Sequence, residues 1–82
     1  MSKLTKEDII LKNAIAQRIE DLRLKTGLTQ SEFAKEYGID RQAISRWESK
    51  NNDRGVTIYT IKRFCLMIGI SLKEFFDIPQ LK

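Results

Sequence analysis

The segment from Thr29 to Trp47, TQSEFAKEYGIDRQAISRW, restricts the fold more than any other part of this chain. Its apolar and small residues recur at the spacing of two short helices that cross, with a bend at Gly38. Gly38 permits the positive φ that a tight turn requires, and Ala34 is small enough for the second helix to pass close to the first. The pattern predicts inward-facing side chains at Phe33, Ala34, Tyr37, Ile39, Ile44 and Trp47.

Hydroxyl and carboxylate residues mark the starts of further helices. Capping boxes, in which a hydroxyl and a carboxylate satisfy free backbone N–H groups, are predicted at Thr5 with Asp8, Thr29 with Glu32, and Ser71 with Glu74. Single caps follow at Asp40 and Thr57, and Pro79 ends the last helix. We expect an all-α, compact five-helix bundle with helices at residues 6–25, 30–37, 41–48, 57–68 and 72–77.

Two of these helices carry apolar stripes at helical spacing, which we assign to the core. The first stripe is Leu11, Ile15, Ile19 and Leu22, and the second is Ile58, Ile61, Cys65 and Ile68, with Phe64 beside it. Cys65 is the single cysteine, and the chain has no histidine. These two facts argue against a disulfide within the chain, a zinc site or a Cys/His nucleophile, so we expect a buried thiol, no metal and no cofactor.

Length and composition indicate how many domains the chain forms and where in the cell we expect it. With 82 residues, 41% hydrophobic and 32% charged, the chain can form one compact core, so we expect a single domain over residues 1–82. No apolar run reaches membrane length, and Lys3 and Lys6 are followed by acidic residues where a signal peptide would be apolar. We therefore expect a cytoplasmic protein that does not contact a membrane.

The net charge of +4 is unevenly distributed along the chain. Residues 1–40 and 64–82 each carry as many acidic as basic side chains. Residues 41–63 hold six basic residues against Glu48 and Asp53, so this segment accounts for the whole excess. Because it contains the second helix of the bent pair, the basic surplus coincides with an element suited to a DNA groove.

The sequence resembles the Cro and phage-repressor type of helix-turn-helix domain, also called the Xre family. The resemblance covers about residues 14–76 and rests on IAQRIEDLRLKTGLTQSEFAKEYGIDRQAISRWE and IYTIKRFCLMIGISLKEFF, which ends in the G-[IV]-S-x-x-x-[FL] pattern. The loop after the second helix of the pair, SKNNDRGVT, departs from the family pattern because it is about two residues longer and lacks the usual Gly-Pro. The resemblance implies a five-helix fold and a DNA-binding function.

The resemblance assigns base recognition to the first turns of the helix at 41–48. The side chains concerned are Arg41, Gln42, Ser45 and Arg46. Their chemistry fits independently, since Gln42 can bond adenine N6 and N7, and either arginine can bond guanine O6 and N7. Arg41 follows the cap directly and can instead turn to a phosphate. The alternative is that all four form only the solvated face of an amphipathic helix.

Other positions inherit phosphate-binding or structural roles. The resemblance gives Gln30 a phosphate clamp, aided by N–H groups at the helix start. The phosphate-contact candidates are Thr29, Gln30, Lys50, Asn51, Asn52 and Arg54. In similar proteins, an arginine of the first helix pairs with a glutamate at the end of the recognition helix, which here implies a structural ion pair of Arg23 with Glu48.

Function follows as an expectation from these features. We expect a bacterial or phage transcriptional regulator, most simply a repressor that binds double-stranded DNA at a palindromic operator as a homodimer. The alternative is an antitoxin or adaptor whose main partner is another protein. An enzyme is not expected, because the chain lacks histidine, a phosphate loop and an evident pair of catalytic carboxylates. Apolar residues at both ends, Leu4, Ile9, Ile10, Phe75, Phe76, Ile78 and Leu81, can form a dimer interface or pack against each other within one chain.

Overall fold

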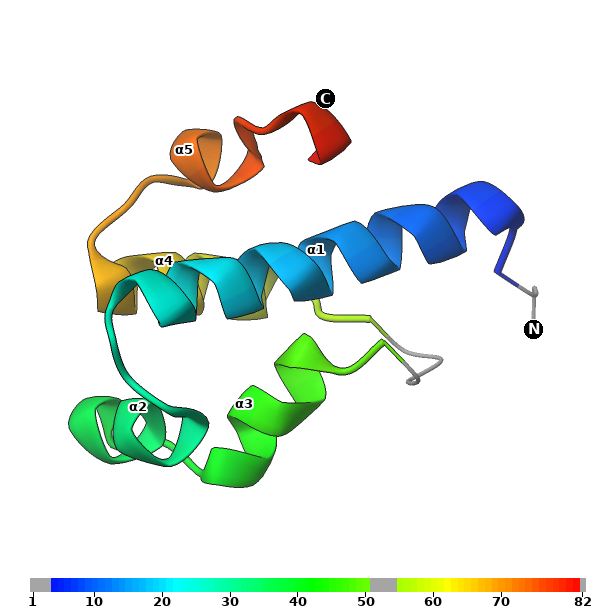
Figure 1. Cartoon of the computed structure of the whole chain (residues 1–82). Coiled ribbons are helices and arrows are strands. Elements are labelled where there is room, and N and C mark those ends of the chain that lie inside the picture. Colours follow the sequence, from blue (N-terminus) through cyan, green and yellow to red (C-terminus); the bar gives the residue numbers. More distant parts are fainter. Residues whose placement is uncertain (1–3, 51–54, 82) are drawn as a thin grey trace.

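The computed structural model describes residues 4–50 and 55–81 (Figure 1). Within these residues the chain is all-helical. The elements are α1 (Lys6–Lys25), α2 (Gln30–Tyr37), α3 (Arg41–Glu48), α4 (Ile58–Ile68), α5 (Leu72–Phe76) and the 3-10 helix η1 (Pro79–Leu81). The predicted five-helix bundle is confirmed, with small differences at its ends: Thr57 caps α4 without joining it, α5 stops at Phe76, and η1 follows where the sequence predicted only a stop.

The helices begin where the sequence places their caps. The Thr29 hydroxyl accepts a bond of 3.1 Å from the Glu32 backbone N–H, and the Glu32 carboxylate accepts one of 2.9 Å from the Thr29 N–H. The same reciprocal pair forms at the starts of α1 and α5. Each box satisfies backbone donors that the first turn of a helix leaves free.

The bend between α2 and α3 depends on Gly38. Its φ of +65° lies in the left-handed region, which a residue with a Cβ atom adopts only at an energetic cost. Past this residue, the Ile39 N–H still donates to the Ala34 carbonyl over 2.9 Å, so the turn is closed by backbone bonds. The geometry confirms the predicted bent pair and fixes the direction in which α3 leaves α2.

Aromatic rings fill the centre of the bundle. Phe33 of α2, Phe64 of α4 and Phe75 of α5 are fully buried, and so are Ile19 and Ile44. The Phe64 ring meets the Trp47 ring edge to face, at a centroid distance of 6.3 Å. The same core therefore joins α3 to α4. Cys65 lies in it as a free thiol whose pKa is raised by burial.

Two residues that we assigned to the core are exposed. Ile19, Leu22 and Ile61 are buried as predicted, but Leu11 is 49% exposed and Ile58 is 51% exposed. Figure 1 shows the reason: the N-terminal half of α1 projects beyond the bundle, past the point where α4 begins. The stripes continue at helical spacing, but at this end no described helix lies opposite them.

The two chain ends behave differently from one another. Phe75 belongs to the core, and η1 packs against α1, so the C-terminal apolar residues are largely used within the chain. At the other end, Ile9 and Ile10 remain 43% and 60% exposed. Within the described residues, no helix, including α1, has the length and apolar character needed to span a bilayer.

Candidate nucleic-acid interface

Helix α3 has a polar outer face and a buried inner face. The four side chains predicted to read bases, Arg41, Gln42, Ser45 and Arg46, are all exposed. Ile44, between them in sequence, is fully buried. Asp40 caps the helix by accepting a 3.1 Å bond from the Gln42 N–H. The exposed face is therefore presented from a short helix that is fixed at its start and along its inner side.

The end of α3 is fixed by an ion pair with α1. The Arg23 Nε donates to Glu48 Oε2 over 2.7 Å, and Arg23 Nη2 lies 3.2 Å from Glu48 Oε1. The two side chains are only 7% and 3% exposed, and Arg23 also donates to the Leu28 carbonyl over 2.8 Å. The bond to Glu48 raises the pKa of Arg23. This bidentate, buried geometry ties α3 to α1 at the orientation that the structure shows.

Gln30 extends this network to α2. Its Nε2 donates to Glu48 Oε1 over 2.9 Å, a contact that the sequence analysis did not predict. An amide nitrogen carries two hydrogens, so one remains for a second acceptor. Gln30, the predicted phosphate clamp, is thus held in place by the same carboxylate that positions α3. The signal available in the sequence was the Arg23–Glu48 pairing, because a carboxylate oxygen that accepts one hydrogen bond can accept a second.

A hollow lies beside the start of α2, between it and the end of α1. Its lining includes Gly27, Thr29, Gln30, Ser31 and Arg41. The free N–H groups at a helix start carry partial positive charge, and Arg41 adds a full one. The structure therefore places Arg41 with the predicted phosphate contacts Thr29 and Gln30. Ser31, which the sequence analysis did not name, also lines the hollow.

The remaining phosphate candidates follow α3. Lys50 is exposed, its ammonium donates to the Gln17 side-chain oxygen, and its carbonyl accepts a 3.2 Å bond from Lys12. Asn51, Asn52 and Arg54 lie outside the described residues. Across residues 4–50 and 55–81, no group of three or more His, Cys, Asp or Glu side chains is arranged to hold a metal ion.

Comparisons with known proteins agree with this geometry. The helix-turn-helix family profile matches residues 19–75. One similar protein is the uncharacterized HTH-type transcriptional regulator YopO, derived from the SPbeta prophage of Bacillus subtilis. It is 32% identical over 63 residues, which cover 77% of this chain and 87% of the relative. No solved structure gives a significant match.

Proposed function

The chain belongs to the helix-turn-helix family of the Cro and phage-repressor type, whose members regulate transcription by binding DNA, and we propose that it is a repressor that reads a palindromic operator as a homodimer. The observation that carries the proposal is the outer face of α3. Four exposed hydrogen-bonding side chains project there from a helix whose inner side and end are buried.

Three of the four side chains are assigned to base edges. Gln42 and Arg46 can form bidentate bonds to adenine and guanine, and Ser45 can donate or accept. Each good bidentate pair discriminates against a wrong base by about 1–3 kcal/mol. The three lie on one exposed face within the first turns of α3, the part of a recognition helix that enters the major groove.

Arg41 is assigned to the phosphate backbone. It lines the hollow at the start of α2 together with Thr29, Gln30 and Ser31, and such a hollow suits a phosphate oxygen. Lys50, Asn51, Asn52 and Arg54, which follow α3 in the sequence, are the other proposed backbone contacts. Phosphate contacts of this kind fix the register of the helix in the groove without reading sequence.

The proposed homodimer follows from the small number of base pairs that one α3 helix can contact. One short helix covers only a few base pairs, so a palindromic site requires two copies with half-sites about 34 Å apart. Repression is the simplest outcome of such binding. The dimer would then act by covering a promoter.

A selection from a random duplex library tests this proposal. We would compare the wild-type protein with Gln42→Ala/Arg46→Ala at near-physiological salt. The matched control is Gln80→Ala/Arg63→Ala, which removes the same residue types and the same charge from exposed positions on η1 and α4. We expect a palindromic motif with the wild type and the control, and a blurred motif with the α3 variant.

Two results would contradict the proposal. If the wild type binds DNA with a steep salt dependence but enriches no sequence, its contacts are to phosphates only. The alternative of a protein-directed antitoxin or adaptor would then lead. If the control blurs the motif as much as the α3 variant does, the assignment of base reading to α3 is wrong.

A further inference from the structure

The uncovered end of the bundle brings the starts of two core stripes together. In Figure 1, α1 and α4 run in the same direction, so their N-terminal portions lie toward the same end of the molecule. Leu11 and Ile15 of α1 line a shallow groove there with Val56 and with Leu4, which precedes the helix. Ile58 follows at the first turn of α4 and is half exposed. We define the end patch as Leu4, Leu11, Ile15, Val56 and Ile58.

The end patch is a continuation of the core and not a scatter of surface residues. Leu11 and Ile15 recur at helical spacing in line with Leu22, which is buried, and Leu4 lies just before the start of the helix. Ile15 and Val56 already pack against the core from their inner sides. The exposed Ile9 and Ile10 lie off this stripe on α1. Exposed apolar side chains that continue a buried stripe are a candidate contact site.

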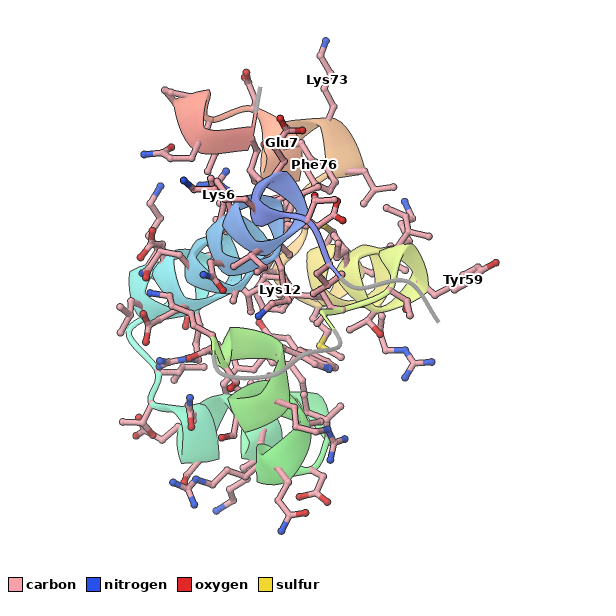
Figure 2. The ribbon with its side chains drawn as sticks, turned by 90° about the vertical axis from the view of Figure 1, so that its right-hand side faces the viewer. Lys6, Glu7, Lys12, Tyr59, Lys73 and Phe76 are labelled. Carbon is pink, nitrogen blue, oxygen red and sulfur yellow. The ribbon has the colours of Figure 1, made fainter. Side chains whose placement is uncertain are left out.

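The charge of the groove favours a second copy of this chain as the occupant. A two-fold axis places a patch against itself, so a patch with net charge repels its own copy. The charged residues in the groove wall are Asp8 and Lys12, one acid and one base. By contrast, the other exposed apolar residues of α4, Tyr59 and Leu66, flank Lys62 and Arg63 in a helix with no acidic residue. Figure 2 shows Tyr59 pointing away from the body of the molecule.

The dimensions of the molecule agree with this placement. Its longest extent is 36 Å, and α1, at 20 residues, spans about 30 Å of such a length. A two-fold axis at the projecting end of α1 places two bundles end to end. Equivalent points near their middles are then separated by about one molecular length, close to the half-site separation of about 34 Å.

We propose that the end patch is the homodimer interface, in which the N-terminal half of α1 and the start of α4 of one copy pack against the same residues of a second copy. This inference rests on the proposed function, because it supplies the dimer that a palindromic operator requires. It assigns the interface to α1 and α4, since the C-terminal aromatic residues are largely occupied within the chain.

Sedimentation equilibrium of the free protein tests the interface without DNA. We would measure the wild type up to about 1 mM, a range that includes weak specific contacts. The test variants, Leu11→Lys and Ile58→Lys, come from two elements and change half-exposed side chains, and lysine at position 11 gains a helical partner in Glu7. The matched control, Leu66→Lys, makes the same change at a side chain that is 68% exposed outside the end patch.

We expect the wild type and the control to dimerise with the same Kd, and both test variants to dimerise at least about tenfold more weakly, because each copy brings a like charge to the apolar contact. Circular dichroism checks that all four proteins keep the same helix content. A wild type that stays monomeric up to about 1 mM overturns the proposal. So does a dimer that Leu66→Lys weakens as much as Leu11→Lys does.

The outcome is separable from that of the library selection. A dimer that depends on Leu11 but selects no DNA sequence would leave the interface standing and reject the proposed function. If the protein selects a DNA sequence but its self-association does not depend on Leu11 or Ile58, the proposed function stands and the proposed interface is rejected.

Discussion

The two halves of α1 have similar apolar periodicity and meet opposite surroundings. In the C-terminal half, Ile19 and Leu22 are buried and Arg23 is paired with Glu48. In the N-terminal half, Ile10 and Leu11 are 60% and 49% exposed. The difference lies in what faces each half, because the inner side of the second half joins one cluster with α2, α3 and α4. Periodicity shows which side chains share a face, but the neighbouring elements decide whether that face is buried.

The covered half should be most sensitive at its ion pair. Arg23→Ala leaves the Glu48 carboxylate buried without its cation, so we expect the free energy of unfolding to fall by about 3–5 kcal/mol. Urea denaturation with linear extrapolation measures this. The double variant Arg23→Met/Glu48→Leu, which removes both charges, should recover much of the loss. A loss for Arg23→Ala below about 1 kcal/mol would mean that the pair behaves like an exposed one.

Matched truncations should distinguish the two halves directly. Ile19→Ala removes methyl groups from a fully buried site, so we expect a loss of about 2–5 kcal/mol in the free energy of unfolding. Leu11→Ala changes a half-exposed side chain and should stay within about 0.5 kcal/mol of the wild type. Both are read from the same denaturation curves at a dilution where any dimer has dissociated. Equal losses would show that the projecting half is as well packed as the rest.

The helix caps should show the same difference between the two halves of the molecule, with smaller losses of unfolding free energy. Thr29→Ala removes the cap that fixes the start of α2, so we expect a loss of about 1 kcal/mol in unfolding free energy. Thr5→Ala removes the same kind of bond from the projecting end of α1, where a frayed turn does not open the core, so its loss should be smaller. If Thr5→Ala is the more damaging change, the projecting end is supported by contacts within the monomer.

The smallest effect should come from acidifying the α2 cap. Hydrogen bonds from the Thr29 backbone and side chain hold the pKa of Glu32 below its usual range. A lowered pKa in the folded state means that the stabilisation is present above the unfolded pKa and is lost as pH falls through the folded one. We expect the Thr29 amide resonance in NMR spectra to titrate at a pH below about 4.3, the usual value for glutamate. Glu32→Gln should abolish that transition, and its persistence would contradict the assignment.

The helix boundaries were predictable because their signals are local. Thr5, Thr29 and Asp40 each satisfy a backbone donor within their own first turn, and Gly38 ends α2 with its own φ. The predicted bounds of α1, α2 and α3 therefore match the structure. The exposed face of α3 was predictable for the same reason, since the buried Ile44 fixes which side of the helix faces out.

The remaining features depend on contacts between elements that are distant in sequence. The exposure of Leu11 and Ile58 is set by where α4 begins relative to α1, which no local pattern encodes. The bond from Gln30 to Glu48 joins residues 18 positions apart. The place of Arg41 beside the start of α2 likewise follows from the crossing of two helices. The roles assigned to these residues at DNA remain proposals.

The central claim is that α3 reads bases while the hollow beside α2 binds a phosphate, and two arginines on one helix test it. Affinities of Arg41→Ala and Arg46→Ala for a selected operator and a scrambled duplex would be measured over a series of salt concentrations. We predict that Arg41→Ala weakens both duplexes equally and lowers the salt slope by about 0.9, the contribution of one phosphate contact. We predict that Arg46→Ala loses about 1–3 kcal/mol of discrimination between them. Equal weakening of both duplexes by both variants would contradict the account.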